Sequence, residues 1–170
     1  MQIRPTSDRL RETLFNVLAP RMDGARFLDL CAGSGAIGIE ALSRDASFVT
    51  FVDRSRKMCG LVEANLDLCG VPEELTEVVL SEASDYLRRR LHARDGTTSW
   101  DIAYFDPPYA FDYAPVLEVF GAHADELLSS SGILIVEHHH KNSLRDALGQ
   151  IRRWRVLKQG DSALSFYERA

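Results

Sequence analysis

The feature that most constrains the fold is an apolar stretch that runs directly into a glycine-rich turn. Residues 27–30 are predicted to form a strand, and Gly33-x-Gly35-x-x-Gly38 follows them. Apolar residues at helical spacing continue after the glycines, so we expect a strand, a turn and a helix in that order. Glycines let a ligand approach the backbone, and the N-terminus of a helix offers N–H groups to it. By itself, this pattern is a weak indication of a nucleotide- or nucleoside-binding loop.

Two carboxylates give the loop a more specific context. The next predicted strand, residues 48–52, ends in Asp53, twenty residues after Gly33, where an acid can hold the two hydroxyls of a ribose. Asp29 lies four residues before Gly33, and we expect it to point into the same loop. A carboxylate there suits an ammonium group and disfavours a pyrophosphate, so the charges favour S-adenosylmethionine over a dinucleotide. A cap on the glycine loop is the alternative role for Asp29, and the two roles are compatible.

A second candidate site is the run Asp106-Pro107-Pro108-Tyr109, which follows an apolar strand predicted at residues 102–105. The end of such a strand lies where open α/β sheets bind their ligands. The two prolines fix φ near about −65° and remove two N–H donors, so we expect the carbonyls of this turn to stay free. The carboxylate and a carbonyl can hold the NH2 group of a planar substrate while Tyr109 covers its ring. An ordinary turn with Tyr109 packed against it is the alternative.

Further candidate binding residues lie at two predicted helix starts. Glu82 and Ala83 follow the third predicted strand, residues 76–80, and Glu82 could accept a hydrogen bond from an adenine amino group. A first-turn acid favoured by the helix dipole explains Glu82 equally well. Arg4 and Thr6 lie in a proline-stiffened stretch just before the first predicted helix, which makes them candidates for substrate binding.

Charge gives only limited information about partners. Arg9 is a third candidate for substrate binding on the first helix, although a solvated face explains it more simply. A solvated face is also the simpler explanation of the run Arg88-Arg89-Arg90. The net charge of −5 argues against coating nucleic acid by bulk electrostatics, and it leaves room for a local basic face.

Composition limits the remaining classes. The 170 residues, 45% of them hydrophobic, suit one globular domain. Cys31, Cys59 and Cys69 lack metal-ligand spacing, so we expect reduced thiols. His138-His139-His140 point different ways on an extended chain and match no acid or cysteine cluster, so we expect no metal. No apolar run reaches membrane-spanning length and no signal-peptide pattern opens the chain, so we expect a cytoplasmic protein with no membrane partner.

The order of strands and helices predicts the fold class. Strands alternate with helices, which is typical of a parallel, doubly wound sheet, and the chain closes with an antiparallel pair at residues 153–157 and 163–167. We therefore expect one α/β, Rossmann-like domain over residues 1–170, opened by a short cap at residues 1–24. Its seven-stranded sheet is mostly parallel, with a C-terminal antiparallel strand and helices on both faces. The oligomeric state is left open, with a monomer as the default expectation.

Four motifs together resemble one family of enzymes. They are Arg4-Pro5-Thr6-Ser7-Asp8-Arg9, the stretch from Asp29 to Gly38, the Asp106-Pro107-Pro108-Tyr109 run, and the segment from Gly160 to Tyr167. The same motifs occur in the same order in the RsmD-type methyltransferases, bacterial enzymes that methylate N2 of a guanine in small-subunit ribosomal RNA. The resemblance covers nearly the whole chain.

This resemblance implies the class I, S-adenosylmethionine-dependent methyltransferase fold. It implies that Asp29, Gly33, Gly35 and Asp53 hold the cofactor. It also implies that Asp106-Pro107-Pro108-Tyr109 forms a clamp for the target amine, and that the partner is ribosomal RNA or a small-subunit ribosomal particle.

The chain departs from the family pattern at two places. Members usually begin with a basic β-hairpin ahead of the Arg-Pro-Thr stretch, whereas only Met1-Gln2-Ile3 precede it here, so we expect a weaker grip on naked RNA. Glu82 stands where relatives often carry Asp or Asn, which affects the predicted adenine contact and leaves the fold unchanged.

Other activities remain open at this point. An adenine-N6 or protein-glutamine methyltransferase uses a similar clamp, although such relatives often carry Asn at the position of Asp106. A nicotinamide-dependent oxidoreductase would share the glycine loop and Asp53. An RNA-binding module could keep the cofactor fold without turnover, which an intact clamp disfavours.

Overall fold

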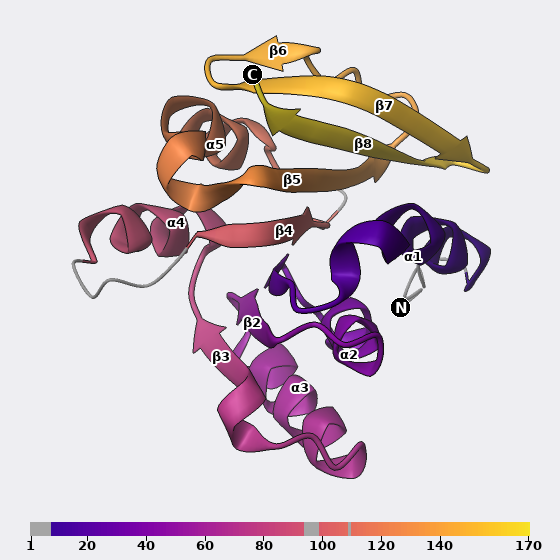
Figure 1. The fold of residues 1–170 in the computed structure, drawn as a ribbon, viewed down its shortest axis with the longest axis vertical. Helices are drawn as coiled ribbons and strands as arrows, with labels where there is room; N and C mark the ends of the chain where they lie inside the picture. The colour runs from indigo at the N-terminus through magenta and orange to yellow at the C-terminus, as the bar shows by residue number, and fades with distance from the viewer. Residues whose placement is uncertain (1–7, 94–98, 109) are drawn as a thin grey trace.

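A sheet of eight strands forms the centre of the computed structural model, which describes residues 8–93, 99–108 and 110–170 (Figure 1). In sheet order the strands are β3 (Thr76–Leu80), β2 (Phe48–Asp53), β1 (Arg26–Leu30), β4 (Trp100–Phe105), β5 (Leu128–His139), β8 (Ser162–Arg169), β7 (Ile151–Gln159) and β6 (Ala147–Leu148). The helices are α1 (Asp8–Met22), α2 (Ala36–Ser43), α3 (Arg56–Leu68), α4 (Ala83–His92) and α5 (Ala114–Leu127), with a short 3-10 helix at Glu73–Leu75.

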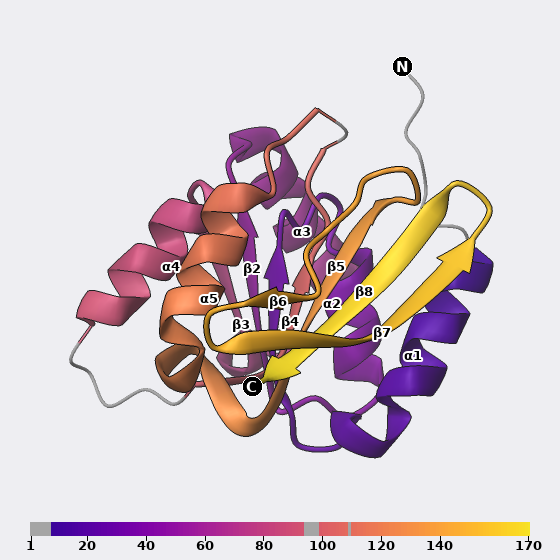
Figure 2. The same cartoon turned by 90° about the horizontal axis from the view of Figure 1, so that it is seen from above.

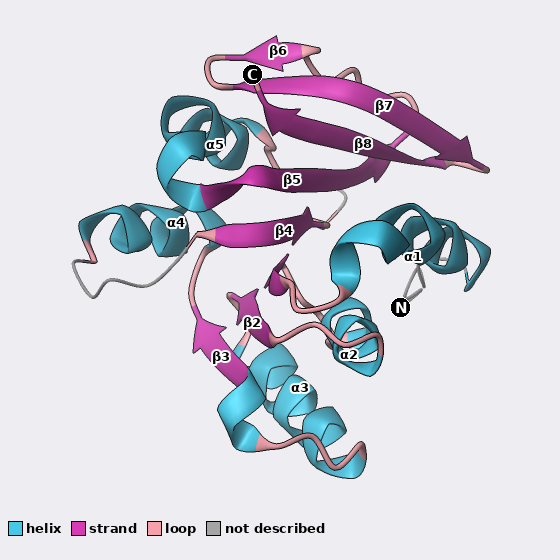
Figure 3. Cartoon of the chain, viewed as in Figure 1, coloured by secondary structure: helices cyan, strands magenta, loops and turns pink. Residues whose placement is uncertain are grey.

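The strand directions confirm the predicted architecture. Five adjacent strands run parallel to one another, in the order β3, β2, β1, β4 and β5. Strand β8 then pairs with β5 in the antiparallel direction. The β7–β8 hairpin extends the sheet beyond β5 (Figure 3). The sequence did not predict β6, which pairs only two residues with β7, because so short a strand has no detectable periodicity.

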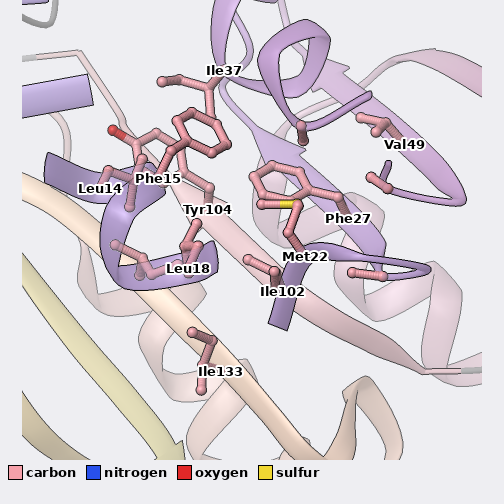
Figure 4. Packing of buried hydrophobic residues seen from close by; sticks show 14 of the residues in the cluster. Leu14, Phe15, Leu18, Met22, Phe27, Ile37, Val49, Ile102, Tyr104 and Ile133 are labelled. Carbon is pink, nitrogen blue, oxygen red and sulfur yellow. The ribbon is translucent and has the colours of Figure 1, made fainter. Parts of the chain in front are cut away.

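Each face of the sheet has its own layer of helices. Helices α1, α2 and α3 lie on one face, and α4 and α5 lie on the other (Figures 1 and 2). Figure 4 shows Leu14, Phe15 and Leu18 of α1 packed near Ile102 and Tyr104 of β4. Burying one such aliphatic or phenylalanine side chain contributes about 1.5–3 kcal/mol, so tertiary packing rather than helix propensity stabilises α1.

The fifth strand begins earlier than the sequence indicates. The apolar run that follows Gly132 predicts a strand that starts at this glycine, but β5 begins at Leu128, which pairs with Trp100 before the register shifts. A Cβ at Gly132 would lie 2.9 Å from the carbonyl oxygen of Trp100. The glycine therefore allows a close approach at an irregular point inside the strand, rather than marking where the strand starts.

Several predictions fall outside the described residues. These are Arg4 and Thr6 as substrate contacts and Tyr109 of the clamp. Among the helices that the structure does describe, none has the length and apolarity that a membrane span requires.

Parallel register brings the ends of four strands to one edge of the sheet. Leu30 of β1 pairs with Val52 of β2 and with Phe105 of β4, and Phe105 pairs with Val136 of β5. The residues that follow these positions on β2, β4 and β5 are all acids. This edge is therefore the candidate functional site, as expected for an open α/β sheet.

Packing around the glycine turn gives a first prediction. A Cβ at Gly38 would collide with the ring of Phe51 and would lie 2.9 Å from Val49, so Gly38→Ala should destabilise the protein by about 1–3 kcal/mol. Gly60→Ala is the matched control, because nothing lies within 4 Å of its added Cβ. Because Gly60 is exposed within a helix, Gly60→Ala should raise the free energy of unfolding by up to about 1 kcal/mol. Urea unfolding midpoints measure both changes, and effects of the same sign would contradict this account.

Candidate active site

The glycine turn between β1 and α2 is tied to the end of β2. Gly33 and Gly35 have φ values of 57° and 82°, in the left-handed region that favours glycine. The half-buried carboxylate of Asp53 accepts hydrogen bonds from Gly33 N–H at 3.0 Å and from Ser55 N–H at 2.9 Å. Each carboxylate oxygen has a further lone pair, so Asp53 can still accept hydrogen bonds from two ribose hydroxyls.

Asp29 lies beneath this turn. It is 2% exposed, and its Oδ2 accepts a hydrogen bond from the N–H of Gly38 in the first turn of α2, at 3.1 Å. Burial raises the pKa of Asp29 to about 8, an effect that the Gly38 N–H partly offsets and the charge of Asp53 increases. The hydrogen bond to Gly38 therefore supports Asp29 as a cap on the glycine loop. Binding of a cofactor ammonium group by Asp29 stays a prediction.

The pKa of the Cys31 thiol shows how acids gather around this part of the site. Burial raises the pKa of its thiol well above the usual range, and the carboxylates of Asp53, Asp106, Asp29 and Glu82 raise it further, in that order. Cys31 is therefore a neutral thiol and does not act as a nucleophile. Asp53, Asp106 and Glu82 make the edge of the sheet a negative site, which suits a cationic ligand.

The predicted clamp begins where β4 ends. The N–H of Asp106 donates to the carbonyl of Leu30 at 3.4 Å, which connects the clamp to the strand that leads into the glycine turn. Our expectation that the carbonyls of this turn stay free is wrong for Pro108, whose oxygen accepts the N–H of Phe111 at 2.9 Å because the chain closes a tight turn there. Among the described residues, no hydrogen bond to the carbonyl of Pro107 is found. Pro107 is therefore the better candidate for a substrate contact.

Sequence reasoning missed a second acid beside Asp106. Glu137 follows Val136, which pairs with Phe105, so the two acids occupy corresponding positions on neighbouring strands. Both line a small cavity of about 30 Å³, together with Pro107, Tyr113, His138, His139 and Asn142. Such a volume has room for one or two water molecules. The end of the apolar run at residues 133–136 could have indicated Glu137, because the ends of two other apolar runs had already singled out Asp53 and Asp106.

Buried polar groups hold this second acid in place. The hydroxyl of Tyr104 donates to Glu137, and burial and that carboxylate keep the pKa of Tyr104 well above its usual value. His138 lies beside it, with its Nε2 at 2.8 Å from the Ser165 hydroxyl and its Nδ1 at 2.9 Å from the His139 carbonyl. Burial lowers the pKa of His138, so this imidazole is neutral near pH 7. These contacts fix the orientation of the strand end that carries Glu137.

Glu82 lies at the start of α4 and is exposed. Its carboxylate is 3.8 Å from the guanidinium of Arg54, which also lies over the ring of Phe111 at 5.9 Å. Arg54 therefore links the turns that follow β2, β3 and β4. Ala83 is buried against the α4 face of the sheet, and its role toward a cofactor, like that of Glu82, stays a prediction.

Only some of the predicted RNA contacts lie among the described residues. Arg9 is exposed at the start of α1, where its carbonyl accepts the Thr13 hydroxyl at 2.9 Å. Arg88 is exposed on α4 and lies 3.5 Å from Asp85, in agreement with a solvated helix face.

The histidine run has a neighbour that the sequence did not indicate. Candidate ligand atoms of His139, His140 and Asp161 lie within 4.8 Å of one another, because the β7–β8 turn folds back onto the end of β5. Spacing along the chain could not indicate this neighbour, because Asp161 lies 21 residues after His140. One nitrogen of each ring is already within hydrogen-bonding distance of the backbone, at Lys141 N and Asp161 O. The absence of a metal stays a prediction.

Sheet order, glycine turn and acidic edge together define the class I, S-adenosylmethionine-dependent methyltransferase fold. A solved structure of the protein yhhF from Escherichia coli matches with a TM-score of 0.81 at 32% identity, over 98% of this chain and 87% of that one. The structure of SMU.776, complexed with SAH, matches with a TM-score of 0.71 at 16% identity, over 92% of this chain and 48% of that one. At that identity the second likeness shows the fold alone.

Sequence comparison identifies the family. The family described as "Conserved hypothetical protein 95" matches residues 1–168. The protein named "Ribosomal RNA small subunit methyltransferase D" from Escherichia coli K12 is 36% identical, over 98% of this chain and 80% of the relative. The chain belongs to this family, and the resemblance to the RsmD-type methyltransferases is confirmed.

The buried acid of the site predicts a pH dependence. Because the pKa of Asp29 rises from 3.8 to about 8 on folding, its contribution to stability falls as pH increases between these values. Asp29→Asn keeps an acceptor for Gly38 and does not titrate. The melting temperature of this variant, relative to the wild type without cofactor, should therefore rise from about pH 4 to about pH 8 and then level off. A difference that stays constant over a series of thermal melts would show that burial does not shift this group.

Proposed function

We propose that this chain transfers the methyl group of S-adenosylmethionine to the exocyclic N2 amine of a guanine in small-subunit ribosomal RNA. The coarser part follows from family membership: the chain is an S-adenosylmethionine-dependent methyltransferase that acts on ribosomal RNA. One observation carries the assignment of the site. The hydrogen bond from Asp106 N–H to the Leu30 carbonyl joins the clamp to the cofactor turn, so methyl donor and acceptor would lie side by side.

The acidic edge supports S-adenosylmethionine as the cofactor. This molecule has a sulfonium and an ammonium group, and the carboxylates that raise the pKa of Cys31 attract both. A nicotinamide dinucleotide would place its pyrophosphate in the same negative site. Asp53 would hold the ribose, the backbone of Gly33 and Gly35 would let the cofactor approach, and Asp29 would face its ammonium group. Glu82 and Ala83 are the proposed neighbours of the adenine.

The methyl transfer itself needs alignment more than acid–base chemistry. The lone pair of a guanine N2 amine is delocalised into the ring, so the amine is a weak nucleophile. Asp106 and the Pro107 carbonyl would hold its N–H groups so that the lone pair faces the methyl carbon at about 3–3.5 Å. The nitrogen–carbon bond forms as the carbon–sulfur bond breaks, and the carboxylate stabilises the positive charge on nitrogen until the proton leaves. Pro108 and Tyr109 complete the proposed clamp around the flipped base.

Glu137 supports guanine over adenine as the target. Guanine carries a hydrogen on N1, directly beside the N2 amine, and a second carboxylate next to Asp106 can accept it. Adenine carries a lone pair on N1, which a carboxylate repels. Adenine-N6 methylation remains the second candidate, because a clamp of this type holds either amine.

The remaining proposals concern the substrate and the chain as a whole. Arg4, Thr6 and Arg9 are the proposed RNA contacts near the start of the chain, and Tyr109 would stack on the target base. We also propose a single domain, no resident metal and a monomer, in a cytoplasmic setting where ribosomal RNA or a small-subunit particle is the substrate.

Removing the clamp carboxylate tests the catalytic assignment. Asp106→Ala should lower the methylation rate of small-subunit ribosomal RNA by about 10²–10³, because one preorganised electrostatic contact to the transition state is lost. Its stabilisation by S-adenosylmethionine should remain, at about 2.7 kcal/mol for a ligand concentration of 100 Kd. Asp67→Ala, which removes an exposed acid at the end of α3, is the control. Full activity of Asp106→Ala would remove Asp106 from the mechanism.

The variant Glu137→Gln tests which base is methylated. One oxygen of Glu137 is held by Tyr104, so Glu137→Gln should place an NH2 group where guanine N1–H has to fit. Loss of a hydrogen bond to a charged group is worth about 1.5–3 kcal/mol, so the rate should fall about 10- to 100-fold. Mass spectrometry of digested RNA should show N2-methylguanosine from the wild type, and Glu118→Gln on the surface of α5 is the control. N6-methyladenosine in its place would favour the second candidate.

A further inference from the structure

Strand β7 concentrates positive charge in an otherwise acidic protein. Its nine residues include Arg152, Arg153, Arg155 and Lys158 and no acid, whereas the whole chain carries a net charge of −5. We infer that Arg155, Trp154 and Arg21, on the face of the sheet that α1 covers, form a surface that binds the RNA strand flanking the methylated guanine. This inference rests on the proposed function for its substrate class. We call these three residues the basic strand surface.

Ion pairs divide the cations of β7 into two groups. Arg152 lies 3.0 Å from Glu168, and Arg153 lies 2.6 Å from Asp146. No ion pair of Arg155 or Lys158 is found among the described residues, and both side chains are exposed. The strand register separates these two cations: Arg155 pairs with Phe166, which packs with α1, whereas Lys158 pairs with Ala163 and points to the opposite face. Arg155 is therefore the cation placed beside Trp154 to neutralise a phosphate, and phosphates dominate the affinity of proteins for nucleic acids.

Trp154 adds an exposed aromatic ring beside Arg155. It is 36% exposed and lies at an irregularity in the strand, where the register shifts between Arg153 and Arg155. Its ring packs on Phe166 at 5.4 Å, and the guanidinium of Arg21 lies 5.9 Å from its centroid. Arg21 in turn donates to the Ser131 carbonyl at 3.0 Å. A fixed indole with an adjacent guanidinium is a suitable platform for an unpaired base.

Sheet register places this surface close to the clamp. Phe105, Val136, Ser165 and Val156 form one row across β4, β5, β8 and β7. Val156 lies between Arg155 and Lys158 in sequence, and Phe105 immediately precedes Asp106. Three strand spacings separate the two ends of the row, a distance of about 14–15 Å. In Figure 2, β8 and β7 lie beyond β5 on the side of α1. One RNA strand can therefore reach both sites.

Protection of a sheet edge is the competing explanation for these charges. Strand β6 pairs only with Ile151 and Arg152, so most of the outer edge of β7 has no strand partner among the described residues. Charged side chains on such an edge prevent pairing with another chain. The two explanations differ in what happens when the charges are removed.

The test compares two neutral variants of the full chain in binding to deproteinised small-subunit ribosomal RNA over a salt series. Arg155→Gln on β7 should reduce the magnitude of the slope of log affinity against log salt by about 0.7, the value for one phosphate contact. Arg88→Gln on α4 is the matched control and should leave the slope unchanged. Trp154→Ala should weaken binding about 5- to 100-fold without changing the slope. Thermal stabilisation by S-adenosylmethionine verifies that each variant is folded.

Three results would overturn the inference. They are an unchanged slope in the β7 variant, an equal loss in the α4 control, or self-association of the β7 variant with unchanged RNA affinity, which would support edge protection. Detection of N2-methylguanosine from the wild type is measured separately. An unchanged slope with N2-methylguanosine present removes only this surface, whereas a reduced slope without N2-methylguanosine removes only the proposed target.

Discussion

Parallel pairing in one register is the constraint on which the rest of this structure depends. It brings the carboxyl ends of β1, β2, β4 and β5 to one edge, although these strands are separated by whole helices in the chain. Two hydrogen bonds then connect the turns at that edge. Asp53 accepts the N–H of Gly33, and Asp106 donates to the carbonyl of Leu30. The cofactor turn and the clamp therefore belong to one rigid unit, which is what transfer between two bound molecules requires.

The same edge creates an electrostatic conflict for an enzyme that acts on RNA. Clustered carboxylates attract a cationic cofactor, and they repel the phosphates that flank a target base. We propose that two separate surfaces resolve this conflict. In this proposal the acidic edge receives the uncharged base and the cationic cofactor, while Arg155, three strands away on β7, receives the phosphate backbone. Such an arrangement would let a chain with a net charge of −5 approach RNA in a defined orientation.

Predictions from the sequence succeeded where one short segment contains its own signal. The glycine turn, the position of Asp53 at the end of β2 and the apolar pattern of α1 each depend on neighbours within a few residues. Predictions failed where a distant segment decides. Gly132 was taken as the start of a strand because the contact with Trp100 that explains it comes from another strand. Asp161 was not linked to the histidine run, because only the β7–β8 turn brings it there.

The sequence by itself determined the fold class and the family, and it indicated the proposed cofactor turn and clamp, because hydrophobic periodicity and local turn chemistry act over short distances along the chain. Only the tertiary structure decided which groups share an environment. It placed Asp29 beneath the turn rather than in open solvent, paired Glu137 with Tyr104 beside Asp106, and left Arg155 and Lys158 without an ion pair among the described residues. Burial, pKa and charge pairing depend on distances between strands, and those distances exist only after the sheet has formed.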